Sequence, residues 1–321
     1  MTTSFLSNVA ADCPSHLLSQ ARKKGPVNLL VVKAGAPLPM QSAYEAMQAG
    51  IAAPILIGRT DDIKSEAAKL GWDLSSVEII DADSEADCAA MAVSVLQSRG
   101  MNTGGSSIGA VLKGQLHTDV FMGALLQRDA GVRIGNRLVH VFAIYPPAEG
   151  QPPLLVSDAA VNVHPDVKTQ QQSIIEMQRL TEALGHGPAR IAVLSATETP
   201  IESVPSSIAA ADLTTWARDT LADTASISGP LSLDLALSEA SVAIKGLTGD
   251  DVAGKANALL VPDLVSGNIL YKSLVYLAGG CAAGLVMGGA VPILLTSRAD
   301  PPAARLASVA LAAILQLDSD A

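Results

Sequence analysis

The chain has 321 residues, of which 49% are hydrophobic, 3% aromatic and 16% charged, and its formal net charge is -10. This composition excludes a disordered chain, and the acidic balance argues against a nucleic-acid partner, whose phosphates require clustered Lys and Arg. The length suggests two domains, with cores built mainly from aliphatic side chains.

Short apolar runs alternate with helical patterns through the first 130 residues. We expect four strands, each a continuous apolar run typical of a strand buried on both faces: 27–32, 51–58, 77–80 and 108–112. Helices are expected at 41–49, 61–70, 85–99 and 120–127. This alternation predicts a mostly parallel sheet with helices on both faces.

The polar segment KGQLHTD, residues 113–119, directly follows the fourth expected strand. Ligands of open parallel sheets bind beyond the carboxyl ends of the strands. Lys113, His117 and Thr118 are therefore candidate substrate-binding residues. The alternative is an ordinary loop in which Thr118 caps the next helix, and position alone does not decide between the two.

A second α/β series begins near residue 139. Strands are expected at 139–144, 154–157, 191–194 and 258–261, with a Pro/Gly-rich hairpin loop at 146–153. Helices are expected before Gly185, at 208–222 and at 269–278. The Gly-Pro pair at 229–230 predicts a turn that leads into a helix.

The sequence offers no clear membrane or export signal. Residues 274–297 carry no charge and are long enough to cross a bilayer, but five glycines and Pro292 divide them into a helix, a loop and a strand. No signal peptide is evident at the N-terminus. Three cysteines without a CxxC pattern fit a reducing compartment. We therefore expect a cytoplasmic protein with no membrane partner.

Residues 291–315 predict a strand, a polar turn and a helix. Asp300 is a candidate N-cap, with Pro301 at the first helical position. A helix N-terminus directs N–H groups and a positive dipole end at one point, and the Arg298 guanidinium is suited to phosphate. This is a candidate anion site. Alternatively, Arg298 forms a surface ion pair and Ser297 is a turn residue.

Motifs of several enzyme classes are missing from the sequence. There is no GxxxxGK[ST], no GxGxxG after a strand, no GxSxG and no HExxH. A metal site from His117 and His164 with Asp158 or Asp166 is conceivable, but isolated histidines beside strands are more often structural, and we predict no metal. Polar clusters after the strands suit a large ligand that bears phosphates, and they favour catalysis by positioning and electrostatics.

Five segments, in this order, resemble the phosphate acetyltransferase and phosphate butyryltransferase family: VLKGQLHTD, LLVSDAAVNVHPD, ISGPLSLDLAL, ANALLVPDLVSGNILYK and VPILLTSRAD. The resemblance spans residues 26–317. It implies a reversible reaction in which acyl-CoA and phosphate give acyl phosphate and coenzyme A, with coenzyme A as a substrate and no cofactor. It also implies a homodimer.

The same resemblance implies the fold of the isocitrate and isopropylmalate dehydrogenases. This is a two-domain, three-layer αβα architecture, with mostly parallel sheets and a cleft between the domains. In that fold the first domain is discontinuous and takes back the C-terminal strand and helix. We therefore assign residues 1–137 and 285–321 to the first domain and residues 138–284 to the second.

The resemblance also implies site residues. Ser297 and Arg298 match the family's Ser-Arg pair, in which the Arg binds phosphate or the developing oxyanion and the Ser hydrogen-bonds the thioester or tetrahedral intermediate. The segment PDLVSGNILYK implies that Asp263, Asn268 and Lys272 bind substrate. Fixed donors at the carbonyl oxygen lower the barrier, since negative charge develops there.

Two positions depart from the acetyltransferase pattern. The Asp found six residues past the Arg, thought to act as a base toward coenzyme A, is Ala304 here, and the Cys of the DCAV motif is Ala159. The missing Asp, together with LTSRAD and the short chain, resembles the butyryltransferase side more closely and leaves the identity of any general base open.

Two other functions remain as alternatives. One is a non-catalytic CoA-binding relative, which the missing Asp allows. The other is a metal-dependent decarboxylating dehydrogenase of the same fold. The dehydrogenase would need a nicotinamide site and a carboxylate cluster, and the sequence offers no DxxxD on a helix.

Overall fold

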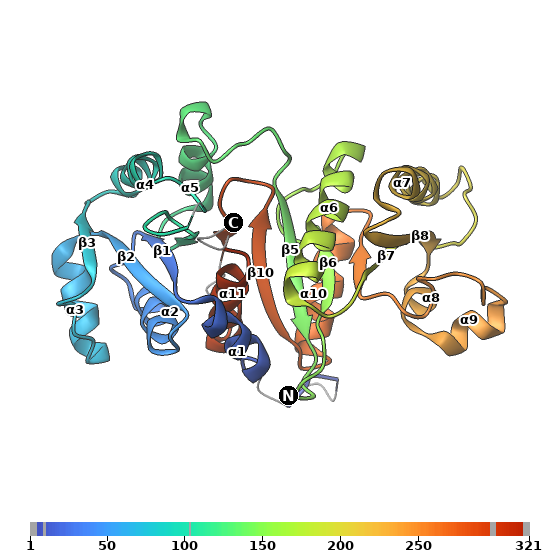
Figure 1. The fold of residues 1–321 in the computed structure, drawn as a ribbon, viewed down its shortest axis with the longest axis horizontal. Helices are drawn as coiled ribbons and strands as arrows, with labels where there is room; N and C mark the ends of the chain where they lie inside the picture. The colour runs from blue at the N-terminus through green and yellow to red at the C-terminus, as the bar shows by residue number, and fades with distance from the viewer. Residues whose placement is uncertain (1–4, 9–10, 103, 296–299, 317–321) are drawn as a thin grey trace. The chain divides into compact units, whose positions relative to one another are not determined.

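The computed structural model describes residues 5–8, 11–102, 104–295 and 300–316. Its contacts divide the chain into two compact units (Figure 1). The first α/β unit comprises Ala11–Asn136 and Ala283–Ala321, and the second comprises Arg137–Ala282 and Met1–Ala10. Ser7 belongs to the second unit, because its N–H donates to the Tyr276 carbonyl over 2.9 Å.

The sheet of the first unit is parallel except at one edge. Its strands lie in the order β3 (Glu78–Asp81), β2 (Ala52–Gly58), β1 (Val27–Val32), β4 (Ala110–Lys113), β11 (Ile293–Leu294) and β10 (Cys281–Met287). Among the described strand pairs of this unit, β10 and β11 are antiparallel and the other pairs are parallel. Most side chains of the central strands are fully buried, which explains their continuous apolar runs.

The helices of the first unit cover both faces of this sheet. They are α1 (Ser15–Lys24), α2 (Pro37–Gln48), α3 (Thr60–Leu70), α4 (Glu85–Arg99), α5 (Thr118–Leu125), the short η1 (Arg128–Ala130) and α11 (Pro302–Ile314). The crossovers through α2 and α3 move outward from β1 to β3, whereas α4 returns the chain to the other side of β1. Because such crossovers are right-handed, α4 lies on the opposite face from α2 and α3, and the unit has three layers.

The sheet of the second unit has the order β5 (Val139–Tyr145), β6 (Leu154–Ser157), β9 (Ala258–Leu260), β7 (Ala189–Leu194) and β8 (Ala225–Leu231). The hairpin β5–β6 is antiparallel and the other pairs are parallel. The helices are α6 (Val167–Leu184), α7 (Pro205–Leu221), α8 (Leu233–Leu237), α9 (Glu239–Lys245) and α10 (Leu264–Tyr276).

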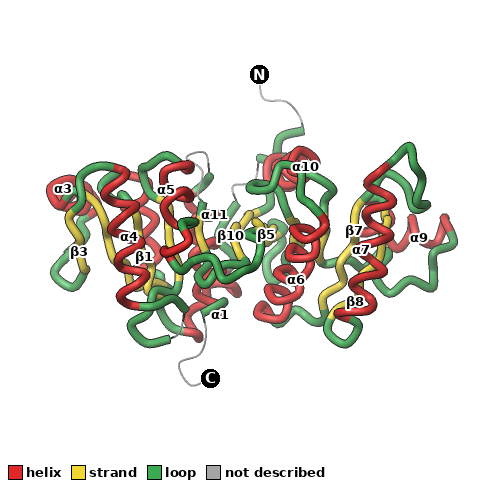
Figure 2. Tube along the Cα trace, turned by 90° about the horizontal axis from the view of Figure 1, so that it is seen from above, coloured by secondary structure: helices red, strands yellow, loops and turns green. Residues whose placement is uncertain are grey.

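One apolar core of the second unit joins α8, α9 and α10 to the sheet. It contains Val156 of β6 and Leu259 of β9, and Leu270 and Leu274 of α10 pack against it. Helix α6 lies on the other side of these strands (Figure 2). The mostly parallel α/β architecture expected from the sequence is therefore confirmed.

Two strands were not expected. The Gly-Pro pair predicts a turn, but it lies inside β8, whose position at the edge of this unit's sheet lets Pro230 lack a ladder donor. A Cβ on Gly229 would lie 2.7 Å from the Cβ of Val193, so this glycine allows close packing of β8 on β7. Residues 281–287 form β10 with every side chain buried, where the glycines predict a loop.

The expected cap of the last helix is also wrong. Helix α11 begins at Pro302, its N-cap is Pro301, and no side chain among the described residues caps it. The Asp300 carbonyl oxygen instead accepts a hydrogen bond from Arg305 Nη1 over 2.6 Å. Pro301 itself occupies the N-cap position, where a capping carboxylate would lie.

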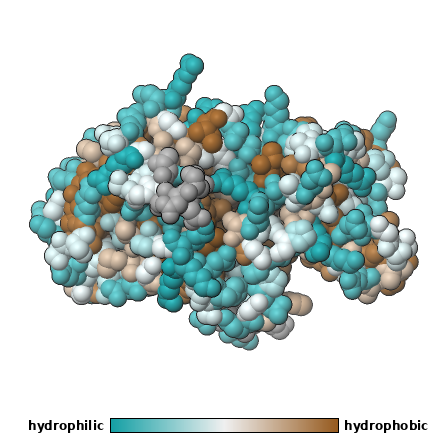
Figure 3. Space-filling view, viewed as in Figure 1, coloured by the Kyte–Doolittle hydropathy of each residue, from teal (hydrophilic) through white to brown (hydrophobic). Residues whose placement is uncertain are grey.

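The surface seen in Figure 3 is largely hydrophilic, with apolar side chains in separate patches. Among the residues that the structure describes, no helix is both long and apolar enough to cross a membrane.

Candidate functional site

Two turns lie against each other at the carboxyl ends of β1 and β4 in the first unit. Gly114 N–H donates to the Val32 carbonyl over 2.8 Å, and Gln115 N–H donates to the Lys33 carbonyl over 3.0 Å. A Cβ on Gly114 would lie 2.5 Å from the Val32 carbonyl oxygen and closer still to that of Lys33, so only glycine fits. Lys33 itself has a φ of 62°, in the left-handed region that side chains rarely adopt.

Lys33 is a polar residue of this edge that the sequence analysis missed. Its Nζ donates to the Asp83 carbonyl. The sequence feature that could have identified Lys33 is its position directly after a buried strand and before Ala-Gly. Residues with strained backbone cluster at active sites and ligand clamps, so we add Lys33 to the candidate residues of this edge.

Lys113, His117 and Thr118 follow β4 as predicted. Lys113 ends the strand, and its Nζ donates to the Leu116 carbonyl over 2.8 Å. His117 is the N-cap residue of α5, and Thr118 is its first residue, so the alternative reading of Thr118 as the cap is wrong. Both the His117 and Thr118 side chains face solvent.

Glu85 fixes the position of His117. The His117 backbone N–H donates to Glu85 Oε2 over 2.9 Å, and His117 Nδ1 lies 2.9 Å from the same oxygen. These hydrogen bonds hold the pKa of Glu85 below its usual range, so the carboxylate stays ionised at neutral pH. The imidazole is thereby oriented through Nδ1.

The predicted catalytic residues Ser297 and Arg298 lie outside the described residues. Within the described parts, β11 pairs with β4 through Leu294 and Leu112, and α11 starts at Pro302. The strand and the helix that the sequence predicts on either side of the Ser-Arg pair are therefore confirmed. Ala304 lies in the first turn of α11 and is buried.

The other three predicted residues lie together on α10 of the second unit. Asp263 is the N-cap, and its Oδ1 accepts from Ser266 N–H over 2.8 Å and from Ser266 Oγ over 3.0 Å. Asn268 Nδ2 donates to the Ala159 carbonyl over 3.3 Å. Lys272 lies one turn later, with its side chain exposed. These residues follow the carboxyl end of β9, and Ala159 follows that of β6.

Asp158 is a further polar residue of this edge, considered from the sequence only as a metal ligand. Its side chain is 2% exposed. Oδ1 accepts from the N–H groups of Ala160 and Val161, each over 2.9 Å. Oδ2 accepts from His140 N–H over 3.1 Å and from Asn162 Nδ2 over 2.6 Å.

His140 of β5, whose backbone N–H donates to Asp158, also has a buried imidazole. Burial lowers the pKa of His140 from 6.5 to about 4, and the nearby Asp158 charge offsets this only partly. The imidazole is therefore neutral at physiological pH. Its ring packs on Phe142 with centroids 4.2 Å apart.

The residues of the conceivable metal site have other partners or lie in different units. His117 is bound to Glu85, Asp158 to the loop that follows it, and Asp166 Oδ1 caps α6 through Thr169 N–H over 2.8 Å. Within the described ranges, no three His, Cys, Asp or Glu side chains are grouped so as to hold a metal ion.

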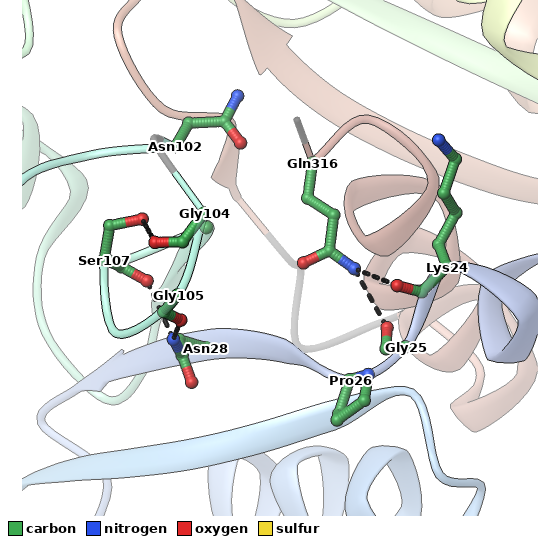
Figure 4. A pocket seen from close by; sticks show the side chains of 10 residues that line it. Lys24, Gly25, Pro26, Asn28, Asn102, Gly104, Gly105, Ser107 and Gln316 are labelled. Atoms are coloured by element: carbon green, nitrogen blue, oxygen red, sulfur yellow. Dashed lines mark hydrogen bonds between the residues drawn. The ribbon is translucent and has the colours of Figure 1, made fainter. Parts of the chain in front are cut away.

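A polar pocket of about 220 Å³ lies at the opposite, amino ends of β1 and β4 (Figure 4). Asn28 and Gly109 line it, and Gln316 Nε2 closes one side by donating to the carbonyls of Lys24 and Gly25 over 3.2 and 2.9 Å. Because ligands of parallel sheets bind at the carboxyl ends, this pocket is not part of the candidate site.

Comparison with known proteins gives consistent results. A family model described as "Phosphate acetyl/butaryl transferase" matches residues 15–132 and 110–313. The chain is 37% identical to the phosphate acetyltransferase of Rhizobium meliloti over 300 residues, which cover 93% of this chain and 92% of that protein. It is 32% identical to the phosphate butyryltransferase of Clostridium acetobutylicum over 276 residues, which cover 86% and 89%.

Solved structures with the same fold include two phosphotransacylases. A branched-chain phosphotransacylase from Enterococcus faecalis aligns with a TM-score of 0.76 at 27% identity, covering 91% of this chain and all of that one. A phosphotransacetylase from Streptococcus pyogenes aligns with a TM-score of 0.78 at 20% identity, covering 93% and 97%. The latter supports the fold alone.

Proposed function

Because the chain belongs to the phosphate acetyl- and butyryltransferase family and is a phosphate acyltransferase, we propose that it transfers an acyl group from acyl-CoA to inorganic phosphate. The observation that carries this proposal is the family match, which runs through both units from residue 15 to residue 313. A phosphate oxygen attacks the thioester carbonyl carbon, a tetrahedral intermediate forms, and the C–S bond breaks. The products are acyl phosphate and the thiolate of coenzyme A, which then takes up a proton.

In this mechanism Arg298 holds the phosphate or the oxyanion, and Ser297 donates to the carbonyl oxygen as negative charge develops there. Such donors act mainly through preorganised electrostatics. Lys113, His117 and Thr118 follow β4, the neighbour of β11, and we assign them to substrate binding in the same unit. The Lys33 ammonium is a further cation of that edge.

We assign Asp263, Asn268 and Lys272 to acyl-CoA, because Arg298 already accounts for the phosphate. An amide donor and an exposed ammonium on adjacent turns suit the polar, phosphate-bearing part of coenzyme A. The Asp263 carboxylate accepts two hydrogen bonds from Ser266, so its contribution is to fix the first turn of α10.

Ala304 leaves this position without a group that could accept the thiol proton of coenzyme A. A buried methyl group at this position cannot remove a proton, so we propose that the thiol ionises into solvent before it attacks acyl phosphate. A thiol pKa of about 8.5 leaves a few per cent as thiolate at neutral pH, which is enough for a reactive nucleophile.

Acetyl, propionyl and butyryl groups remain possible substrates, since relatives with either the acetyl or the butyryl name match most of the chain. A homodimer and a cytoplasmic location, both expected from the sequence, stay predictions. Light scattering during size-exclusion chromatography measures the first, and a mass of one chain would contradict it.

The proposed function is tested by thiol release from acetyl-, propionyl- and butyryl-CoA with and without phosphate. We expect release only with phosphate, and a loss of about 100-fold or more in Arg298→Ala, as for removal of an oxyanion donor. Arg99→Ala is the control, because Arg99 is a partly exposed residue at the C-terminus of α4 that pairs with Glu78. Binding of coenzyme A without any release would favour the non-catalytic alternative.

A further inference from the structure

Asp158 is a buried carboxylate whose two oxygens are both fully engaged. Its backbone donors are the N–H group of His140 in β5 and those of Ala160, Val161 and Asn162 in the loop that follows. The Asn162 N–H lies 3.3 Å from Oδ2. Asn162 Nδ2, which donates to Asp158, also donates to the Leu138 carbonyl over 2.9 Å. The carboxylate therefore ties the loop 159–162 to β5.

The same loop supports the N-terminal half of α10. Asn268 Nδ2 donates to the Ala159 carbonyl, and Leu264 N–H donates to the Val163 carbonyl over 3.2 Å. A Cβ on Gly267 would lie 2.7 Å from the Asp158 carbonyl oxygen and 3.1 Å from Ala159 Cα. The helix thus approaches the loop backbone as closely as glycine allows.

Aromatic packing holds α10 against β5 on the same face. His140 packs on Phe142, and Phe142 stacks on Tyr271 of α10 with centroids 4.1 Å apart and planes 7° apart. The His140 backbone N–H donates to Asp158 Oδ2 over 3.1 Å, which joins this strand to the carboxylate. The loop, β5 and the helix therefore form one packed assembly with the Asp158 carboxylate inside it.

From this geometry we infer that Asp158 is a positioning residue for acyl-CoA binding. It acts through the Ala159 carbonyl, which orients the Asn268 amide, and it touches no substrate itself. This inference rests on the proposed function and on the assignment of Asn268 to acyl-CoA. An error of about 1 Å in a positioning group is enough to cost a large factor in rate.

The test is a double-mutant cycle with Asp158→Asn, Asn268→Ala and the double variant in the full-length chain. Asp158→Asn keeps the volume but turns an NH₂ group toward N–H donors. We expect each single variant to raise the KM for acyl-CoA about tenfold or more, with a smaller change in the KM for phosphate. The double variant should be no worse than the more affected single variant, because the two residues act on one contact.

Asp250→Asn is the matched control. Asp250 is also a carboxylate of the second unit that accepts from a following loop, with Val252 and Ala253 N–H groups at 2.8 Å, but this loop precedes β9 and does not contact α10 through these bonds. We expect it to lower thermal stability without changing either KM. Gly267→Ala serves as a second route to the same contact if Asp158→Asn does not fold, with the same expected rise in the KM for acyl-CoA.

Additive effects of Asp158→Asn and Asn268→Ala, or an unchanged KM for acyl-CoA in both Asp158→Asn and Gly267→Ala, would overturn the inference. Wild-type protein without phosphate-dependent release would instead refute the proposed function itself. The two failures are therefore distinguishable.

Discussion

The guanidinium of Arg305 donates through Nε to the Ser42 hydroxyl over 2.9 Å, and both side chains are buried. Its Nη1 donates to the Asp300 carbonyl, so one buried cation connects α11, α2 and the backbone two residues before α11. We expect Arg305→Met to lower the free energy of unfolding by about 2–4 kcal/mol, because the hydrogen bonds to a charged donor are lost. Urea denaturation measures this.

The control for that experiment is Arg99→Met, which removes a partly exposed ion pair and should cost less than about 1 kcal/mol. Equal stability of Arg305→Met and wild type would show that the guanidinium contributes nothing to this connection.

The buried imidazole of His140 should make the second unit sensitive to acid. Its pKa is about 4 in the folded protein and 6.5 in the unfolded chain, so between these values the unfolded chain binds more protons. Stability should therefore fall as the pH drops from 6.5 to 4. The loss approaches about 3 kcal/mol, since one pKa unit corresponds to about 1.4 kcal/mol.

Thermal unfolding of wild type and His140→Phe across this pH range measures the effect. The variant should show a flatter dependence on pH, whereas parallel curves would assign the acid sensitivity to other groups.

Substitutions at Asp263 distinguish its role as the N-cap of α10 from a direct contact with substrate. Asp263→Asn keeps a side-chain oxygen for Ser266 N–H and should leave stability within about 0.5 kcal/mol of wild type, while Asp263→Ala should lose about 1 kcal/mol. We expect Asp263→Asn to retain most activity, because the residue acts by fixing the helix start. A large rise in the KM for acyl-CoA in Asp263→Asn, at unchanged stability, would show that the charge itself contacts substrate.

The reaction from acyl phosphate and coenzyme A should depend on the ionisation of the thiol. With Ala304 in place of a base, the rate constant kcat/KM for coenzyme A should rise about tenfold per pH unit below the thiol pKa of about 8.5. Initial rates from pH 6 to 9 at saturating acyl phosphate test this. A plateau that begins near pH 6 would mean that another group accepts the proton.

Much of the sheet follows from apolar runs alone. The strands β1, β2, β4 and β5 are buried on both faces, so their sequences contain no competing helical period. The turn predicted at Gly229 and Pro230 is wrong, because this pair, typical of turns, also suits an edge strand that packs closely on its neighbour. The small side chains of β10 carry too weak a period to distinguish a strand from a loop.

The candidate site was only partly predictable, for a similar reason. Lys113, His117 and Asn268 follow strands, and position relative to a strand can be read from the sequence. The role of Asp158 depends on which backbone N–H groups face it, and Lys33 depends on a left-handed turn, neither of which leaves a periodic signal. The function of all predicted site residues stays a prediction.

Gly114 makes the turn after β1 depend on a residue some 80 positions further along the chain. Any side chain at 114 would push the Lys33 carbonyl away, so variation at these two positions cannot be independent. In a set of aligned relatives we expect glycine at 114 wherever the left-handed turn at 33 is kept, and paired changes where it is not. A combinatorial library aimed at the substrate preference of this enzyme should therefore hold Gly114 constant while it varies Lys33.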